Sequence, residues 1–178
     1  MKNKVLEAVR NSLDLLLRED GCLFDCQIEQ DPPCNARKLH EVCINHKLAN
    51  YLEHTVLPIL ASEEKRFVDI EFNREGRNYK EVQINGCDST LRPDIIIHNR
   101  KSGLEKRNFL VVECKKIGCT KEEIEEDKQK IIAFMVDDRY KYSFGLQVIY
   151  GKDQVTGFLF FKGDKGIDPE KIVVGRVE

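Results

Sequence analysis

The sequence predicts an α/β fold with a mixed β-sheet flanked by helices, and two observations support this class. Helical and strand-like segments alternate along the chain. A helical pattern at 120–136 separates two apolar runs, which favours a crossover connection between strands. The 178 residues are long enough for one domain with its own core. We divide this domain into an N-terminal helix and connector (1–35), a core (36–150) and C-terminal strands (151–178).

The first helix is expected at residues 2–18, because apolar side chains recur there at helical spacing. These side chains are Val5, Leu6, Val9, Leu13, Leu16 and Leu17. Gly21 follows as a stop signal, and residues 20–35, with two prolines and three cysteines, are typical of a connector. We interpret the helix as one that covers the core or contacts a partner subunit.

A second helix, at 36–55, carries a carboxylate on its apolar stripe. At about 100° per residue, Glu41 lies on the stripe formed by Ile44, Leu48 and Leu52. A charge on such a stripe must be paired or used, since burying a bare charge is costly. Glu41 is therefore a candidate site residue. The alternative is a salt bridge to Arg37, Lys38 or Lys47.

Residues 67–73 alternate between apolar and polar side chains, which predicts a half-buried strand. Val68, Ile70 and Phe72 fall on one face, opposite Asp69, Glu71 and Asn73. Residues 74–78 are typical of a turn, and residues 79–84 of a strand that returns beside the first. Asn85–Gly86 marks a second turn.

Two apolar, β-branched runs at 92–98 and 109–115 are predicted to be strands, joined as a hairpin by a charged loop. Because side chains alternate along a strand, one face of the second run is shared by Phe109, Val111, Glu113 and Lys115. In a hairpin, the start of the first strand meets the end of the second. Asp94 should then lie beside Glu113 and Lys115.

This grouping predicts a Mg²⁺ site. Two carboxylates, Asp94 and Glu113, with an adjacent backbone oxygen form a hard oxygen site of the kind that Mg²⁺ prefers. Such an ion lowers the pKa of a bound water and stabilises charge on a phosphoryl group. Lys115 is placed to orient that water or to stabilise the developing charge. Cys114 points to the opposite face, so only its backbone carbonyl would reach the metal.

The spacing of these residues resembles a known nuclease signature. Pro93–Asp94, eighteen residues and then Glu113–Cys114–Lys115 are similar to the PD-(D/E)xK signature of the restriction-endonuclease-like superfamily. Further stretches resemble small standalone members of that superfamily, namely His40–Glu41, Val68–Arg74, Arg92–His98 and Gly145–Leu146. The resemblance covers roughly residues 36 to 150.

The resemblance implies a restriction-endonuclease-like α-β-β-β-α-β core, here with an extra N-terminal helix, and a metal-dependent DNA endonuclease. Lys115, Glu113 and Asp94 would be catalytic. Mg²⁺, for which Mn²⁺ can substitute, would be held by Asp94, Glu113, Cys114 and Glu41, because the helix before the core strands often supplies an acid in this superfamily. The alternative is a catalytically inactive module of the same fold that binds nucleic acid or a protein, with Glu113 and Lys115 as a surface ion pair. A small-molecule α/β enzyme is a third hypothesis, but the sequence has no cofactor motif for it.

The helix at 120–136 begins with the form of a capping box, Thr120 to Glu123. Its stripe is formed by Ile124, Ile131 and Met135, with Asp127 and Lys128 close by. The charge run 122–130 is interpreted as a solvated face. Gln129 would begin the Gln-x-x-x-Tyr motif of the RecB-like branch, but residue 133 is Ala, so the motif is absent. Strands are expected at 144–150 and 155–162, and an edge strand at 172–177.

The overall charge argues mildly against a strong nonspecific nucleic-acid binder. The 29 basic and 31 acidic side chains leave a net charge of −2, whereas such binders are usually basic. Charge is uneven, however, because six basic residues oppose two acidic ones between Arg100 and Lys116. They predict a basic rim that holds phosphates, or else a solvated hairpin tip.

The seven cysteines are an odd number and no secretory signal precedes them, which predicts a reduced, cytoplasmic protein. Cys22, Cys26 and Cys34 do not form the paired spacing of a zinc site. The sequence contains no run of about eighteen apolar residues, so no membrane span is predicted. Nucleic acid, favouring DNA, is the expected partner, and a homodimer would be favoured if one site per chain is to cut both strands.

Overall fold

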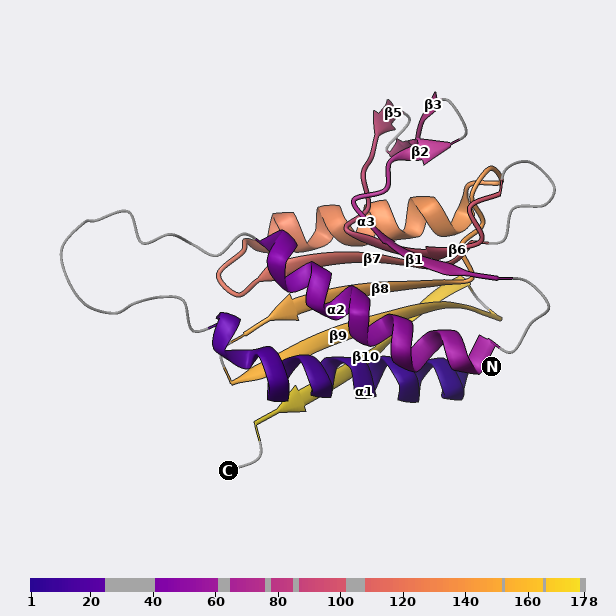
Figure 1. Cartoon of the computed structure of the whole chain (residues 1–178). Helices are drawn as coiled ribbons and strands as arrows, with labels where there is room; N and C mark the ends of the chain where they lie inside the picture. Colours follow the sequence, from indigo (N-terminus) through magenta and orange to yellow (C-terminus); the bar gives the residue numbers. More distant parts are fainter. Residues whose placement is uncertain are drawn as a thin grey trace.

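The computed structural model shows a mixed α/β fold (Figure 1). The parts of the chain that it describes form a six-stranded, mostly antiparallel sheet and three α-helices. The predicted α/β class and mixed sheet are therefore confirmed. The described residues are 1–24, 41–60, 65–75, 78–84, 87–101, 108–151, 153–164 and 166–176.

The strands of the sheet lie in the order β1-β6-β7-β8-β9-β10. Every neighbouring pair is antiparallel except β7 and β8, which run parallel. This exception arises because helix α3 connects these two strands and carries the chain back along the sheet. The strands are β1 (Phe67–Ile70), β6 (Ile95–His98), β7 (Asn108–Lys116), β8 (Phe144–Tyr150), β9 (Gln154–Gly163) and β10 (Gly166–Gly175).

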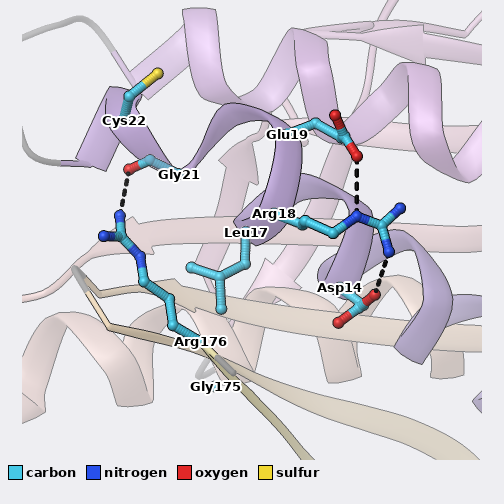
Figure 2. Close-up of a pocket in the computed structure, with 8 residues that line it drawn as sticks. All are labelled: Asp14, Leu17, Arg18, Glu19, Gly21, Cys22, Gly175 and Arg176. Carbon is cyan, nitrogen blue, oxygen red and sulfur yellow. Dashed lines mark hydrogen bonds and ion pairs between the residues drawn. The ribbon is translucent and has the colours of Figure 1, made fainter. Parts of the chain in front are cut away.

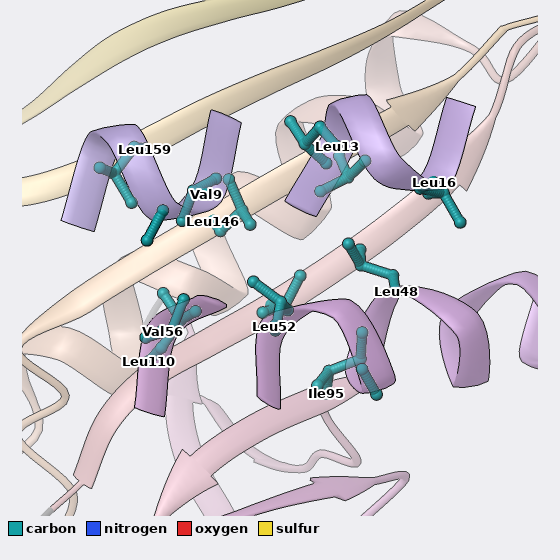
Figure 3. Packing of buried hydrophobic residues seen from close by; sticks show 14 of the residues in the cluster. Val9, Leu13, Leu16, Leu48, Leu52, Val56, Ile95, Leu110, Leu146 and Leu159 are labelled. Carbon is teal, nitrogen blue, oxygen red and sulfur yellow. The ribbon is translucent and has the colours of Figure 1, made fainter. Parts of the chain in front are cut away.

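Helices α1 (Lys2–Asp20) and α2 (Glu41–Val56) cover one face of the sheet, and α3 (Lys121–Val136) covers the other (Figure 1). Apolar side chains from α1, α2 and the strands pack together in the larger core (Figure 3). The amphipathic pattern that predicts the first helix marks the residues buried there. No helix in the described ranges is both long enough and apolar enough to cross a membrane.

The predicted helix boundaries agree with the structure where it can be compared. Helix α1 extends to Asp20 and is followed by a 3₁₀ turn, η1 (Gly21–Phe24). Helix α2 ends before η2 (Leu57–Leu60), while residues 36–40 of the predicted helix lie outside the described residues. The capping box of α3 is confirmed, because Thr120 accepts from the Glu123 backbone N–H and Glu123 accepts from the Thr120 N–H.

Two residues of β8 set how closely α3 approaches the sheet. Gly145 has no side chain, and a Cβ built there would lie 2.1 Å from Cγ2 of Ile131 on α3. Gln147 lies two residues further along β8 and on the same face. Its buried side chain donates a 2.7 Å hydrogen bond to the Ile124 carbonyl of α3. Gly145 therefore leaves room for α3 to lie close to the sheet, and Gln147 holds the helix there.

The prediction for residues 67–84 is wrong in two respects. Strand β1 ends at Ile70 instead of continuing to 73, because Glu71 takes a positive φ of 48° that turns the chain out of the sheet. Residues 79–84 do not return beside β1, whose partner is β6. Two small hairpins project there instead (Figure 1). They are β2 (Arg74–Glu75) with β3 (Asn78–Tyr79), and β4 (Glu81–Ile84) with β5 (Cys87–Thr90).

The hairpins are anchored on the α3 side of the sheet. The ammonium of Lys80, only 1% exposed, donates a 2.9 Å hydrogen bond to the Tyr142 hydroxyl. The backbone N–H of Glu81 donates to the Tyr140 hydroxyl at 2.9 Å. The predicted turn at Asn85–Gly86 lies outside the described residues.

A β-bulge changes the direction of Phe109. Ile97 pairs with Leu110 but His98 pairs with Asn108, so the register skips Phe109. Bulges redirect a side chain, and the Phe109 ring packs in the core beneath α1 and α2. The expectation that Phe109 shares a face with the site residues of β7 is therefore wrong.

The C-terminal strands agree with the prediction for β8 and β9, which cover 144–150 and 154–163. The edge strand β10 begins earlier than expected, at Gly166 instead of 172, because it pairs with β9 along its whole length. Pro169 is tolerated because β10 lies at the edge of the sheet.

We expect Gly145→Ala to destabilise the protein by about 1–3 kcal/mol, the usual effect of overpacking a core. The added methyl group would collide with Ile131 and push α3 from the sheet. Gly175→Ala is the matched control, because the nearest atom to a Cβ there is 3.9 Å away. Urea unfolding of both variants measures the difference. Equal midpoints would show that α3 can move away without cost.

Candidate active site

The candidate site lies where β6 begins and β7 ends. Ile95 pairs with Val112, so Asp94, the residue before β6, lies beside the last residues of β7. Its Oδ2 accepts a 2.7 Å hydrogen bond from the backbone N–H of Cys114. Its own carbonyl accepts from the Glu71 N–H at 2.9 Å, which ties it to the end of β1. Asp94 is therefore held by backbone contacts on both sides.

Glu113 and Lys115 project from β7 toward α3. Val111, two residues earlier on the same face, belongs to the core under α3, and side chains two apart share a face. Glu113 is only 5% exposed. Burial raises the pKa of Glu113 well above its ordinary value, and the charges of Asp94 and Asp127 raise it further. Asp94 lies near enough to both residues for its charge to raise the pKa of Glu113 and of Lys115.

The pKa of Asp94 is raised to about 6. Burial is the main cause, opposed by the hydrogen bond from Cys114 N–H and increased by the nearby charge of Glu41. The side chain of Cys114 is buried on the opposite face, as expected, where burial raises the pKa of its thiol. A thiol in that position faces the core, so the backbone carbonyl remains its predicted contribution.

Glu41, the first residue of α2, reaches the same end of the sheet. Burial raises the pKa of Glu41, while Lys115, Lys116 and the Lys116 backbone N–H oppose that rise. Its Oε1 atom is buried and has no hydrogen-bond partner. The salt bridge to Lys47 is ruled out, because Lys47 pairs with Asp20 at 3.2 Å. The other two alternatives, at 37 and 38, lie outside the described residues.

Asp127 of α3 also faces this site and is not among the site residues predicted from the sequence. It is 1% exposed, and its carboxylate lies 3.3 Å from the Lys115 ammonium and 2.8 Å from that of Lys130. The interpretation of 122–130 as a solvated face is therefore wrong for Asp127. Its position three residues after Ile124 on the apolar stripe is the signal that would have identified it.

The acidic side chains at this end of the sheet are of the type that binds a hard divalent cation, but they are not drawn together around one point. Among the described residues, no three His, Cys, Asp or Glu side chains converge closely enough to hold a metal ion. Two observations nevertheless point to missing positive charge. Glu41 presents a buried oxygen without a partner, and the charges of Asp94 and Asp127 raise the pKa of Glu113. Glu41, Asp94 and Glu113 are oxygen donors of the type that Mg²⁺ and Mn²⁺ bind.

One residue of the predicted basic rim, Arg100, is committed to another contact. Arg100 binds the Asp69 carboxylate, with Nε to Oδ2 at 2.8 Å, and its guanidinium lies over the Phe67 ring. Arg100 is therefore committed to a structural pair and is not free for phosphate. Lys106 and Arg107 lie outside the described residues. So do Cys26 and Cys34, whereas the side chain of Cys22 is exposed.

Two hollows lie elsewhere on the surface. One, of about 470 Å³, lies between the end of α1 and the end of β10, where Arg176 donates to the Gly21 carbonyl and Arg18 contacts Asp14 and Glu19 (Figure 2). The other, of about 620 Å³, lies near Phe109 and Phe161. Neither is lined by a residue of the candidate site.

Comparisons with family models, with curated proteins and with solved structures find no match for this chain.

We expect Asp94→Asn to stabilise the protein by roughly 1–3 kcal/mol at pH 8 without divalent ions. A carboxylate whose folded pKa is raised contributes stability below its unfolded pKa and loses it as the pH rises through about 6. The difference between variant and wild type should therefore shrink below pH 6 and vanish below about pH 4. Thermal unfolding across this pH range measures it.

Asp138→Asn is the control, because Asp138 is 91% exposed and should show no such pH-dependent difference. Added Mg²⁺ or Mn²⁺ should raise the melting temperature of the wild type but not that of Asp94→Asn, since a ligand stabilises the state that binds it. A variant that is less stable than wild type at pH 8 in chelator would contradict the electrostatic account.

Proposed function

We propose that this chain is a metal-dependent nuclease of the restriction-endonuclease-like type, which hydrolyses phosphodiester bonds in DNA. The observation that carries the proposal is that carboxylates from the start of α2, from the residue before β6 and from β7 lie with the Lys115 ammonium at one end of the sheet. Their strand context and spacing are those of the PD-(D/E)xK signature that the sequence resembles.

The order of elements supports the same proposal. Helix α2, strands β1, β6 and β7, helix α3 and strand β8 follow one another along the chain. This is the α-β-β-β-α-β succession that the resemblance implies, with two small hairpins between β1 and β6 and with α1 as the extra helix.

Asp94 and Glu113 would hold Mg²⁺, and Glu41 and the backbone carbonyl of Cys114 would supply its further oxygen ligands. When bound, the ion lowers the pKa of a water and offsets charge on the phosphoryl group. Burial alone would lower the pKa of Lys115, but Asp127, Glu41 and Asp94 raise it above its ordinary value. Lys115 is therefore an ammonium at neutral pH. It acts as a hydrogen-bond donor that orients water and stabilises developing negative charge, and not as a general base.

An inactive module that binds nucleic acid or a protein is the second candidate. It is favoured by one observation, the pairing of Lys115 with Asp127 at 3.3 Å, which gives the amine a partner within the fold. An ion pair of this kind would serve a scaffold without catalysis equally well.

Nicking of supercoiled plasmid in Mg²⁺ or Mn²⁺ tests the proposal. We expect Asp94→Ala and Lys115→Ala each to lower the rate by about 10²–10³-fold, the usual loss when one electrostatic group is removed from an active site. Lys128→Ala is the control, because Lys128 pairs with Glu125 on the outer side of α3 and should keep the wild-type rate.

Each outcome separates the two candidates. Nicking that survives both active-site substitutions would identify a contaminating nuclease. DNA binding without cleavage in either metal would favour the inactive module. Loss of nicking in the Lys128→Ala control would instead show that the assay reports general loss of fold.

A further inference from the structure

Asp127 is the most deeply buried charged side chain at the candidate site and comes from an element outside the PD-(D/E)xK signature. It is 1% exposed, whereas the two lysines that it contacts are each 28% exposed. A carboxylate buried to this degree is tolerated only when it is paired. Here one carboxylate bridges Lys115 of β7 and Lys130 of α3.

The position of Asp127 is set by contacts that lie on either side of it in α3. The hydrogen bond from Gln147 to the Ile124 carbonyl holds the helix three residues before Asp127. Gly145 allows Ile131, four residues after it, to approach the sheet. Gln147 pairs in register with Glu113, so this anchor lies directly beside the site. Asp127 therefore faces β7 from a segment of α3 that contacts the sheet on either side of it.

The two ion pairs are unequal. Lys130 lies at 2.8 Å from Oδ1, within hydrogen-bonding distance, and its partner is one turn away on the same helix. Lys115 lies at 3.3 Å from Oδ2, an oxygen that forms no well-aligned hydrogen bond. The closer lysine neutralises the carboxylate, and the looser one keeps N–H groups available for another acceptor, since an ammonium has three donors.

We propose that Asp127 is a positioning residue that holds the Lys115 ammonium beside Asp94 and Glu113, with Lys130 as its counterion. The inference rests on the proposed nuclease function. A lysine side chain has four rotatable bonds and a strongly hydrated head, so without a fixed partner it samples many positions. Asp127 restricts the amine of Lys115 to the side of β7 where the water and phosphate would lie.

A purely structural ion triad would have a different signature. Its loss would change stability and leave the turnover of the folded enzyme intact. Loss of a positioning residue lowers kcat with little change in KM, because the group that it holds acts in the transition state. Its effect also disappears when the positioned group is already absent.

The experiment compares Asp127→Asn, Asp127→Glu and the control Glu126→Gln in plasmid nicking with Mg²⁺. Glu126 is the exposed neighbour of Asp127 on α3 and should behave as wild type. We expect kcat to fall by roughly 10- to 100-fold for both Asp127 variants, as misplacement of a catalytic group by about 1 Å can cost 10²-fold. KM should remain near its wild-type value. In the Lys115→Ala background, Asp127→Asn should cause no further loss.

Labelling of lysines with an amine-reactive ester, read by mass spectrometry, tests the same inference without DNA. Lys115 should react several-fold faster in Asp127→Asn than in wild type, while Lys128 reacts equally in both. Asp127→Glu keeps the charge, so it remains informative if the Asn variant is poorly folded. Wild-type kcat in both Asp127 variants, or unchanged Lys115 labelling, would overturn the inference. A wild type that never nicks DNA would defeat the proposed function, whereas the labelling would still decide the role of Asp127.

Discussion

The hydrogen bond from the Cys114 N–H to Asp94 Oδ2 is the contact on which the candidate site depends. It is 2.7 Å long and joins the start of β6 to the end of β7. A one-residue slip between these strands would send Glu113 to the opposite face, because side chains alternate. The register is specified by the apolar residues beyond it, with Ile95 and Val112 paired in the core under α1 and α2. The packing of the larger core thus determines that Asp94 lies beside the end of β7 that carries Glu113.

The same packing makes the site electrostatically costly. Burial is the first cause of the raised pKa of Glu41, Asp94 and Glu113, and repulsion from neighbouring carboxylates, with Asp127 acting on all three, adds to it. A protein gains nothing in stability from such an arrangement, since buried carboxylates are favourable only when compensated. Strain of this kind is typical of functional sites, where a ligand supplies the compensation. The excess of carboxylates over the lysines that face them is the physical reason to expect a cation.

Local patterns in the sequence predict an element well where the pattern reflects burial or capping of residues within that element. The amphipathic period of α1, the capping box of α3 and the apolar runs of β6 to β9 all correspond to observed elements, because burial and capping act over a few residues. The misses have non-local causes. The positive φ of Glu71 and the bulge at Phe109 depend on how neighbouring strands pair. Arg100, which follows β6, forms its ion pair with Asp69 on the neighbouring strand β1, 31 residues earlier in the sequence. No window of sequence contains these partners.

Asp127 is the most instructive of these misses, because its burial depends on a glycine. The charge run at 122–130 is ordinarily interpreted as an exposed helix face, and this interpretation is correct for the outer side of α3. Only the absence of a side chain at Gly145 brings the helix near enough to bury the inner side. A carboxylate so placed must find cations, and those within reach are Lys130 on its own helix and Lys115 on β7. Close packing of α3 and the placement of the Lys115 ammonium are therefore consequences of one structural constraint.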